Sequence, residues 1–485
     1  MSISGSLSNA LSGLTASARA TQLVSSNVAN AMTEGYGRRE LSLSARLTGG
    51  AGSGVSVDGV TRIIDETVLR DRRLADAGMA SADTESAFFA DLQALVGIPG
   101  DEGALSSRLA AFEAALIEAS SRPDLQARLE AVARTAVDLA SGLNGTSDGI
   151  QALRMDADAE IARTISDTNT TLARIAEVNA LILRNGGAGR DVSSLLDQRQ
   201  QLVDRLADVV PLRVLPRDNG TIAIYTQGGA ALLDIRPAKL GFAPTATIVA
   251  DMTQTSGALS GLTVNGQLIQ TSGNFAPFAG GRLDALFRIR DDAAVTAQAR
   301  VDAVARDLVE RVTDPAVDAT LAPGAAGLFT DAGAAFDPAN EVGLAARLAV
   351  NAAVLPASGG ALWRIRDGIA AAAPGEAGSN AVLSALSAAL QADRTPSSGA
   401  FTVAARTASG LAGDLASLIG SDLRAADTTS AYRRAQLESL RLTELSGGVD
   451  TDQEMQKLLL IEQAYAANAQ VIRTVDDLIQ LLLGI

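Results

Sequence analysis

The chain has 485 residues and a formal net charge of −15, and an acidic chain without a basic run is not expected to have nucleic acid or an anionic membrane as its main partner. It contains no histidine and no cysteine, which excludes Ser-His-Asp and Cys-His active sites, the usual zinc sites and iron–sulfur clusters held by thiolates. The apolar fraction of 47%, with only 3% aromatic residues, favours long, closely packed helices over a large sheet enzyme.

The first predicted helix lies at the N-terminus, where apolar and small residues recur at spacings of three and four. Its opposite face is rich in Ser, Thr, Asn, Gln and Gly, so we expect this helix to need a packing partner. Residues 1–33 carry one charge, Arg19, and do not resemble a secretory signal. No stretch reaches the roughly 18 apolar residues that span a bilayer. The stripe consists of Leu7, Leu11, Leu14, Ala18, Thr21, Ser25, Val28 and Met32.

Helical patterns continue through the first half of the chain, at residues 62–97 and 105–117. A nearly unbroken pattern from residue 124 to about 184 predicts a helix about 90 Å long, with Asn144-Gly145 as a candidate break. The glycine-rich residues 49–54 precede no clear helix and no Lys-Ser/Thr pair follows them, so we predict a flexible loop rather than a phosphate site.

Three groups of charged residues fall on these predicted helices. Residues 156–160 resemble the start of a calcium loop but lack the glycine at its sixth position, so we interpret them as a solvated face. The arginines within residues 70–73 are interleaved with acidic residues, which predicts surface ion pairs. The charged residues within 197–205 share a helix with a leucine stripe and predict ion pairs at helical spacing. We therefore expect no catalytic residue among them.

The apolar period changes to two near residue 210. Two segments centred on Asn-Gly, residues 212–224 and 262–269, each read as a hairpin. We expect residues 206–280 to form a small β-rich insert. Residues 316–360 are rich in Gly, Ala and Pro and show no clear pattern. Helical patterns return at residues 283–308, 378–392 and 408–446.

The C-terminal segment has the strongest repeat in the chain. Two positions of the heptad are apolar over four heptads, with one asparagine among them. This pattern predicts either a coiled coil, in which Asn468 sets the register, or an ordinary amphipathic helix of a bundle. The two sets are Leu458, Tyr465, Ile472 and Ile479, and Ile461, Asn468, Val475 and Leu482.

Several segments resemble known flagellar sequences. Residues 26–38, Ser-Asn-Val-Ala-Asn-Ala-Met-Thr-Glu-Gly-Tyr-Gly-Arg, are similar to the Asn-Asn-Ile-Ala-Asn…Thr-x-Gly-Tyr-x-Arg motif of bacterial flagellar rod, hook and hook-associated proteins. They differ from it by Ser26 and by one extra residue before Thr33. Residues 194–203, Ser-Leu-Leu-Asp-Gln-Arg-Gln-Gln-Leu-Val, resemble the Asp-Leu-Leu-Asp-Gln-Arg-Asp-x-Leu-Leu signature of the hook-associated protein 1 family. Two further segments, 280–286 and 446–472, resemble the same family.

This resemblance implies a structural protein that forms the first junction layer between the flagellar hook and the filament, and not an enzyme. It implies export, unfolded, by the flagellar type III apparatus, and therefore a secreted, extracellular place in the flagellum. The implied partners are further copies of the chain, the hook protein, the second junction protein and an export chaperone on the C-terminal region. No cofactor and no metal are expected. A hook or rod protein, the second junction protein and flagellin remain as alternatives.

We therefore predict a mainly α protein with a β insert, whose terminal helices pair as a coiled coil and are weakly ordered until assembly. Assembly would bury the apolar residues of both terminal helices. The predicted parts are residues 1–45 with 446–485 as a terminal helical domain, 46–205 with 281–315 and 376–445 as a long-helix shaft, 206–280 as a β-rich outer domain, and 316–375 as part of either the outer domain or the shaft. The predicted assembly residues are Leu7, Leu11, Leu14, Asn27, Asn30, Gly35, Tyr36, Leu458, Ile461, Tyr465, Asn468, Ile472, Val475, Ile479 and Leu482.

Overall fold

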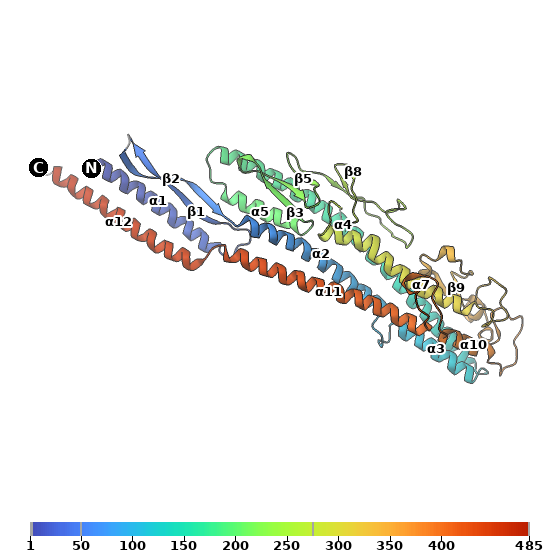
Figure 1. Cartoon of the computed structure of the whole chain (residues 1–485). Coiled ribbons are helices and arrows are strands. Elements are labelled where there is room, and N and C mark those ends of the chain that lie inside the picture. Colours follow the sequence, from blue (N-terminus) through green and yellow to red (C-terminus); the bar gives the residue numbers. More distant parts are fainter. Residues whose placement is uncertain (1–2, 49–50, 274–275, 484–485) are drawn as a thin grey trace.

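The computed structural model describes residues 3–48, 51–273 and 276–483. It is an elongated, mainly helical molecule with small sheets, as the sequence predicts, and both ends of the chain lie at the same narrow end (Figure 1). Among the described helices, none is long and apolar enough to cross a membrane.

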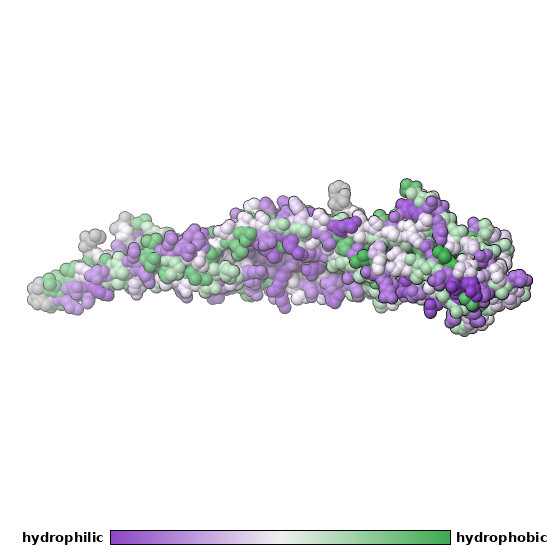
Figure 2. All heavy atoms as spheres, turned by 90° about the horizontal axis from the view of Figure 1, so that it is seen from below, coloured by the Kyte–Doolittle hydropathy of each residue, from purple (hydrophilic) through white to green (hydrophobic). Residues whose placement is uncertain are grey.

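The narrow end is formed by two helices and a hairpin, which we call the terminal unit. Helix α1 (Ile3–Ala29) and helix α12 (Thr451–Leu483) lie side by side. Strands β1 (Arg38–Thr48) and β2 (Ala51–Ile63) form an antiparallel hairpin that packs on α1. Figure 2 shows apolar residues on the surface of this end.

The hairpin corrects the sequence analysis. Residues 51–54 belong to β2, so a flexible loop was the wrong prediction for them; residues 49–50 lie outside the described part. The strand continues to Ile63, where a helix was expected to have begun. Gly54 has φ of +106°, and a Cβ there would lie 2.1 Å from the Ser12 hydroxyl of α1. Glycine therefore allows β2 to touch α1 closely.

The remaining long helices form the shaft. Helix α2 (Glu66–Val96) leads away from the terminal unit, and α11 (Ala408–Ser446) returns beside it. The Asp65 side chain caps α2 by accepting from the amides of Thr67 and Val68, at 2.9 and 3.1 Å. The shaft also contains α3 (Leu105–Ser121), α4 (Gln126–Gly187), α5 (Ser193–Ala207), α6 (Arg282–Arg288), a π-helical turn (Ile289–Ala293), α7 (Ala294–Val312) and α10 (Ala381–Gln391).

The long rod of the sequence analysis is confirmed as a single helix, α4, of 62 residues. It does not break at Asn144-Gly145, because it remains helical through both residues. The Asn144 side chain instead donates to the carbonyls of Ala345 and Leu348, at 2.6 and 3.2 Å. This asparagine therefore fastens the segment after α7 to the shaft.

Both Asn-Gly hairpins are confirmed. Asn219 and Asn265 have φ of 58° and 53°, and the glycine after each also has a positive φ, as a tight hairpin turn requires. The strands are β3 (Leu212–Pro216), β4 (Ile222–Thr226) and β5 (Ala231–Leu233) in one sheet, and β6 (Leu240–Gly241), β7 (Thr263–Val264) and β8 (Gln267–Leu268) in another.

The segment without a clear pattern packs against the shaft. Its β10 and α8 contact α4, and Phe329 of β9 meets Phe112 of α3 edge to face, with 5.6 Å between the ring centres. Its elements are β9 (Phe329–Asp331), α8 (Leu344–Arg347), β10 (Leu348–Val350) and α9 (Trp363–Asp367). Short 3₁₀ turns lie at Asp218–Gly220, Pro338–Asn340, Ala352–Val354, Pro356–Ser358 and Gly399–Phe401.

The interpretation of residues 156–160 as a solvated face is wrong at Asp158. This carboxylate is fully buried and accepts from Arg290 Nη1 at 2.6 Å and from the Thr245 amide at 2.6 Å. Asp156 is exposed. Asp158 thus joins α4 to the β-rich insert of residues 206–280, which we call the outer insert, and to the turn before α7.

Candidate functional site

Helix α1 buries mostly small residues in its contacts with α12 and the hairpin. Its buried positions are Ala10, Ala16, Ser17, Val24 and Asn27. A Cβ on Gly13 would lie 2.7 Å from the Asn468 side chain, so the two helices approach closely at that point. Small side chains are what permit so short an interaxial distance.

The leucine stripe expected on α1 is therefore not its contact face with α12. Leu7 is 37% exposed and Leu11 is 59% exposed, while Leu14 is half-buried. The face of small residues packs on α12 and the hairpin, and this turns the leucine face outward. Both leucines stay available for a contact outside the chain.

On α12, the predicted heptad residues largely share the face turned to α1. Asn468 contacts Gly13, and its amide donates to the Ala464 carbonyl of its own helix at 2.9 Å. Val475 is buried, and Leu458, Ile461, Asn468, Ile472 and Ile479 are half-buried. Tyr465 and Leu482 are 49% and 61% exposed.

A second apolar face of α12 was missed in the sequence analysis. We call it the outer stripe: Leu460, Ala464, Ala467, Val471 and Leu478. Leu460, Val471 and Leu478 are 65%, 42% and 47% exposed. Their spacings of four, three, four and seven residues place them on one side of the helix, and this repeat was the signal that could have found them. An exposed apolar row of this length is a candidate interaction surface.

Asn27 ties together three elements of the terminal unit. Its Nδ2 donates to Glu454 Oε2 and to the Arg39 carbonyl, each at 2.9 Å. Its Oδ1 accepts from the Tyr36 hydroxyl at 2.8 Å and from the Arg39 amide at 3.0 Å. Asn27 and Glu454 are each 1% exposed. The end of α1, the start of β1 and the first turn of α12 therefore meet at one fully bonded side chain.

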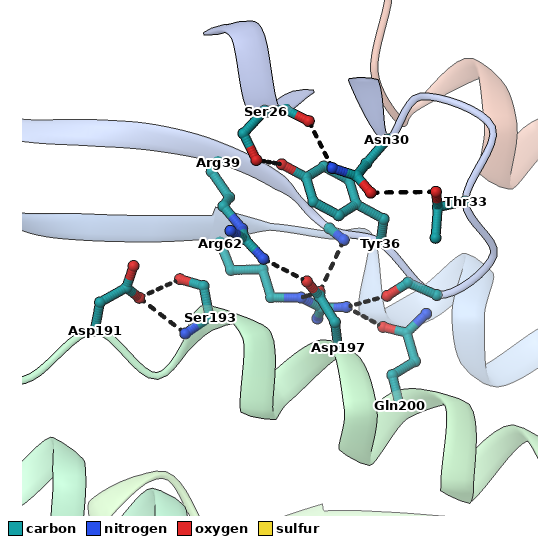
Figure 3. A network of polar contacts seen from close by, with 12 residues as sticks. Ser26, Asn30, Thr33, Tyr36, Arg39, Arg62, Asp191, Ser193, Asp197 and Gln200 are labelled. Carbon is teal, nitrogen blue, oxygen red and sulfur yellow. Dashed lines mark hydrogen bonds and ion pairs between the residues drawn. The ribbon is translucent and has the colours of Figure 1, made fainter. Parts of the chain in front are cut away.

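The other predicted motif residues shape the loop between α1 and β1 (Figure 3). Asn30 donates to the Ser26 carbonyl at 2.9 Å, and Thr33 donates to Asn30 Oδ1 at 3.3 Å. Gly35 has φ of +76°, and a Cβ there would lie 2.8 Å from the Gln201 side chain of α5. The loop can thus approach the shaft only with glycine at this position.

Asp197 of α5 accepts three hydrogen bonds from the base of the hairpin (Figure 3). The donors are the Gly37 amide at 3.0 Å, Arg39 Nη2 at 2.8 Å and Arg62 Nε at 2.7 Å. Arg62 also donates to Gln200. The predicted ion pairs at helical spacing are therefore wrong here, because the carboxylate pairs with residues far away in the sequence.

Arg199, two residues further along α5, has no carboxylate partner among the contacts of the described residues. It donates to Asn179 Oδ1 at 3.0 Å and to the Gly220 carbonyl at 2.6 Å. Burial, together with the nearby Arg62 and Arg73, lowers the pKa of Arg199 to about 10. The surroundings of Asp197 are thus crowded with positive charge.

Arg72 and Arg73 are also buried, so the predicted surface pairs are wrong for both. Arg72 pairs with Asp76, with Asp204 at 2.8 Å and with Glu444 at 2.6 Å, and Arg73 pairs with Asp204 at 2.6 Å. Burial raises the pKa of Asp76 and of Glu444, and Arg72 offsets part of this rise. These pairs hold α2, α5 and α11 together next to the terminal unit.

Replacing Asn27 with alanine is expected to destabilise the terminal unit by about 2–3 kcal/mol, because buried partners in three elements lose a hydrogen bond. Hydrogen exchange should accelerate in the first turn of α12 and at the start of β1, with little change in α4. Asn30→Ala is the matched control, since its bonds stay within one loop, and it should cost less than about 1 kcal/mol. Equal effects of the two variants would contradict this role of Asn27.

Two family models match parts of the chain. Residues 89–323 match the flagellar hook-associated protein FlgK helical domain, and residues 446–485 match the flagellar basal body rod FlgEFG protein C-terminal. The first match runs from the end of α2 through α7 and includes the outer insert. The second match covers α12.

Curated relatives and a solved structure carry related names. The chain is 27% identical over 241 residues to flagellar hook-associated protein 1 of Bacillus subtilis, covering 47% of each chain. It is 28% identical over 268 residues to the Salmonella typhimurium protein of that name, covering 53% of this chain and 48% of the relative. The matched regions span about half the length of these relatives. The flagellar hook junction protein FlgK from Burkholderia pseudomallei aligns with a TM-score of 0.45 at 20% identity, over 54% of this chain and 46% of that one.

Proposed function

Because this chain belongs to the flagellar hook-associated protein family, we propose that it forms the first junction layer between the flagellar hook and the filament. It is a structural protein rather than an enzyme, as its family and relatives indicate. Its proposed partners are further copies of itself, the hook protein and the second junction protein. Its proposed place is outside the cell, in the flagellum.

The observation that carries this proposal is the apolar surface of the terminal unit. The outer stripe of α12 and the leucines at positions 7 and 11 of α1 are exposed, although they recur at helical spacing. Burial of each large apolar side chain contributes about 1.5–3 kcal/mol. A subunit that stacks on its neighbours through α1 and α12 would bury these rows, and a lone subunit leaves them in water.

We also propose that the chain is exported, unfolded, by the flagellar type III apparatus, and two features of the sequence and structure support this. The chain has no cysteine, so no disulfide has to be broken before passage through a narrow type III channel. The terminal unit has little core of its own, because most positions of α12 are exposed or half-buried. We propose that a chaperone covers the apolar faces of α12 before export and that assembly covers the exposed rows of the terminal unit again.

The first test is Ile472→Asp. Ile472 is half-buried on the face of α12 turned to α1, so a charge there should break the helix pair and stop addition to isolated hooks. Electron microscopy of hooks incubated with purified protein measures the addition. Circular dichroism should show that the shaft stays folded, while proteolysis should remove the ends faster than in the parent chain. Addition at the parental level would refute assembly through the terminal helices.

A further inference from the structure

The chain passes between the terminal unit and the shaft at three short segments. These are residues 30–37 between α1 and β1, residues 64–65 between β2 and α2, and residues 447–450 between α11 and α12. The last of them contains Gly447-Gly448. Three short connections at one level of an elongated molecule (Figure 1) do not by themselves fix an angle between its two parts.

Polar contacts with α5 hold the base of the hairpin at this level. Asp197 accepts from Gly37 and Arg39 at the start of β1 and from Arg62 at the end of β2. One carboxylate therefore accepts hydrogen bonds from the bases of both strands. Gln201, one turn further along α5, donates to the Glu34 carbonyl at 2.9 Å.

The charges around Asp197 explain why its carboxylate is needed to hold the base of the hairpin against α5. The side chains of Asp197, Arg39 and Arg62 are 12%, 16% and 9% exposed, so the attraction between them is little screened by water. Arg199 lies close enough to Arg62 for the two charges to oppose each other. Without the carboxylate, buried arginines would face one another, and the hairpin base would be pushed from α5.

A cleft of about 510 Å³ lies at the junction. It is lined by residues 31–36 and 448–449, by Arg441 and Glu444 of α11, and by residues of α2 and α5 that include Gln201. Packing between the terminal unit and the shaft is therefore incomplete there. The pairs of Arg72 with Asp204 and Glu444 join shaft elements to one another, so they would persist if the terminal unit moved.

We propose that Asp197 is a latch that fixes the angle between the terminal unit and the shaft. When its three hydrogen bonds are lost, the terminal unit swings about the three connections while both parts stay folded. Asp197 is thus a positioning residue for the whole terminal unit. The latch is a property of the single chain and does not depend on its proposed place in the flagellum.

The test measures a distance across the junction. The chain has no cysteine, so spin labels can be placed at Ala180→Cys on α4 and Ala466→Cys on α12, both exposed positions. Double electron–electron resonance between the two spin labels should give one narrow distance distribution in the parent chain. Asp197→Ala should broaden it at least twofold. The control Asp138→Ala, which breaks an exposed pair with Arg108 on the shaft, should leave it narrow.

Each outcome decides the proposal. A broad distribution in the parent chain, or a narrow one in folded Asp197→Ala, would overturn it. Circular dichroism and hydrogen exchange within α4 report whether that variant is folded. If it is not, Arg39→Gln replaces it, because Asp197 then keeps its bonds to Arg62 and the Gly37 amide. Arg39→Gln should give intermediate broadening, and an unchanged distribution would overturn the latch.

Discussion

Replacing Val471 with aspartate is expected to stop addition of the protein to the hook while leaving the monomer as stable as the parent chain. Val471 is 42% exposed on the outer stripe, so a charge there meets water in the single chain. In an assembly that buries the stripe, the same carboxylate would be desolvated without a partner, which costs several kcal/mol. Each 1.4 kcal/mol lowers an association constant about tenfold.

Two other substitutions on α12 serve as comparisons for Val471→Asp. Ile472→Asp lies one residue away on the adjacent, half-buried face, and it should weaken the monomer as well as its assembly. Ala466→Asp is the matched control, because this exposed residue lies outside both apolar faces of α12, and it should add to hooks normally.

The measurements are addition to isolated hooks, seen by electron microscopy, and the thermal unfolding of each monomer. If Val471→Asp added as well as Ala466→Asp, the outer stripe would not be an assembly surface. If Val471→Asp unfolded at a lower temperature than Ala466→Asp, the stripe would instead serve the monomer. Either result would contradict the proposed role of the outer stripe in assembly.

The second large effect is expected inside the shaft, at Arg290. Its side chain is fully buried and donates to Asp158 at 2.6 Å, to Asp291 at 2.8 Å and to the Ser260 carbonyl at 3.0 Å. Arg290→Met would leave the buried Asp158 carboxylate with the Thr245 amide alone. Removing one partner of a buried pair costs about 3–5 kcal/mol, and urea unfolding of the variant should show a loss of this size.

An exposed pair within the β-rich insert, residues 206–280, provides the control. Arg217 and Asp234 lie 3.0 Å apart with side chains 49% and 44% exposed, and Asp234→Ala should cost less than about 1 kcal/mol because water solvates the remaining charge. A loss of under 1 kcal/mol in Arg290→Met would mean that this pair does not hold the insert to α4.

The elements that follow from local rules were predictable from the sequence. Helix α4 repeats apolar residues at helical spacing through 62 residues, so any partner that covers one face selects a helix. The turns at Asn219 and Asn265 need a positive φ at two successive residues, which Asn-Gly adopts with little strain. The hairpin of β1 and β2 also alternates, with Leu41 and Leu43 opposite Val60 and Val57, but its glycines concealed the pattern.

The partners of charged residues were not predictable in this way. Asp197 and Asp158 sit on helices where a neighbour three or four residues away is the local expectation. Their actual partners, Arg62 and Arg290, are more than 100 residues away. A sequence gives the charge of a side chain, whereas the partner depends on which elements the fold brings within hydrogen-bonding distance.

The terminal unit shows most clearly which features the sequence determines and which depend on the tertiary structure. The sequence by itself determined that α1 and α12 are helices with apolar rows, because the spacing of Leu7, Leu11, Ile472 and Ile479 is a local property. Only the tertiary structure decided which rows meet. The two helices approach closely where Gly13 faces Asn468, mostly small residues of α1 are buried, and the leucines of α1 and the outer stripe of α12 are left on the surface.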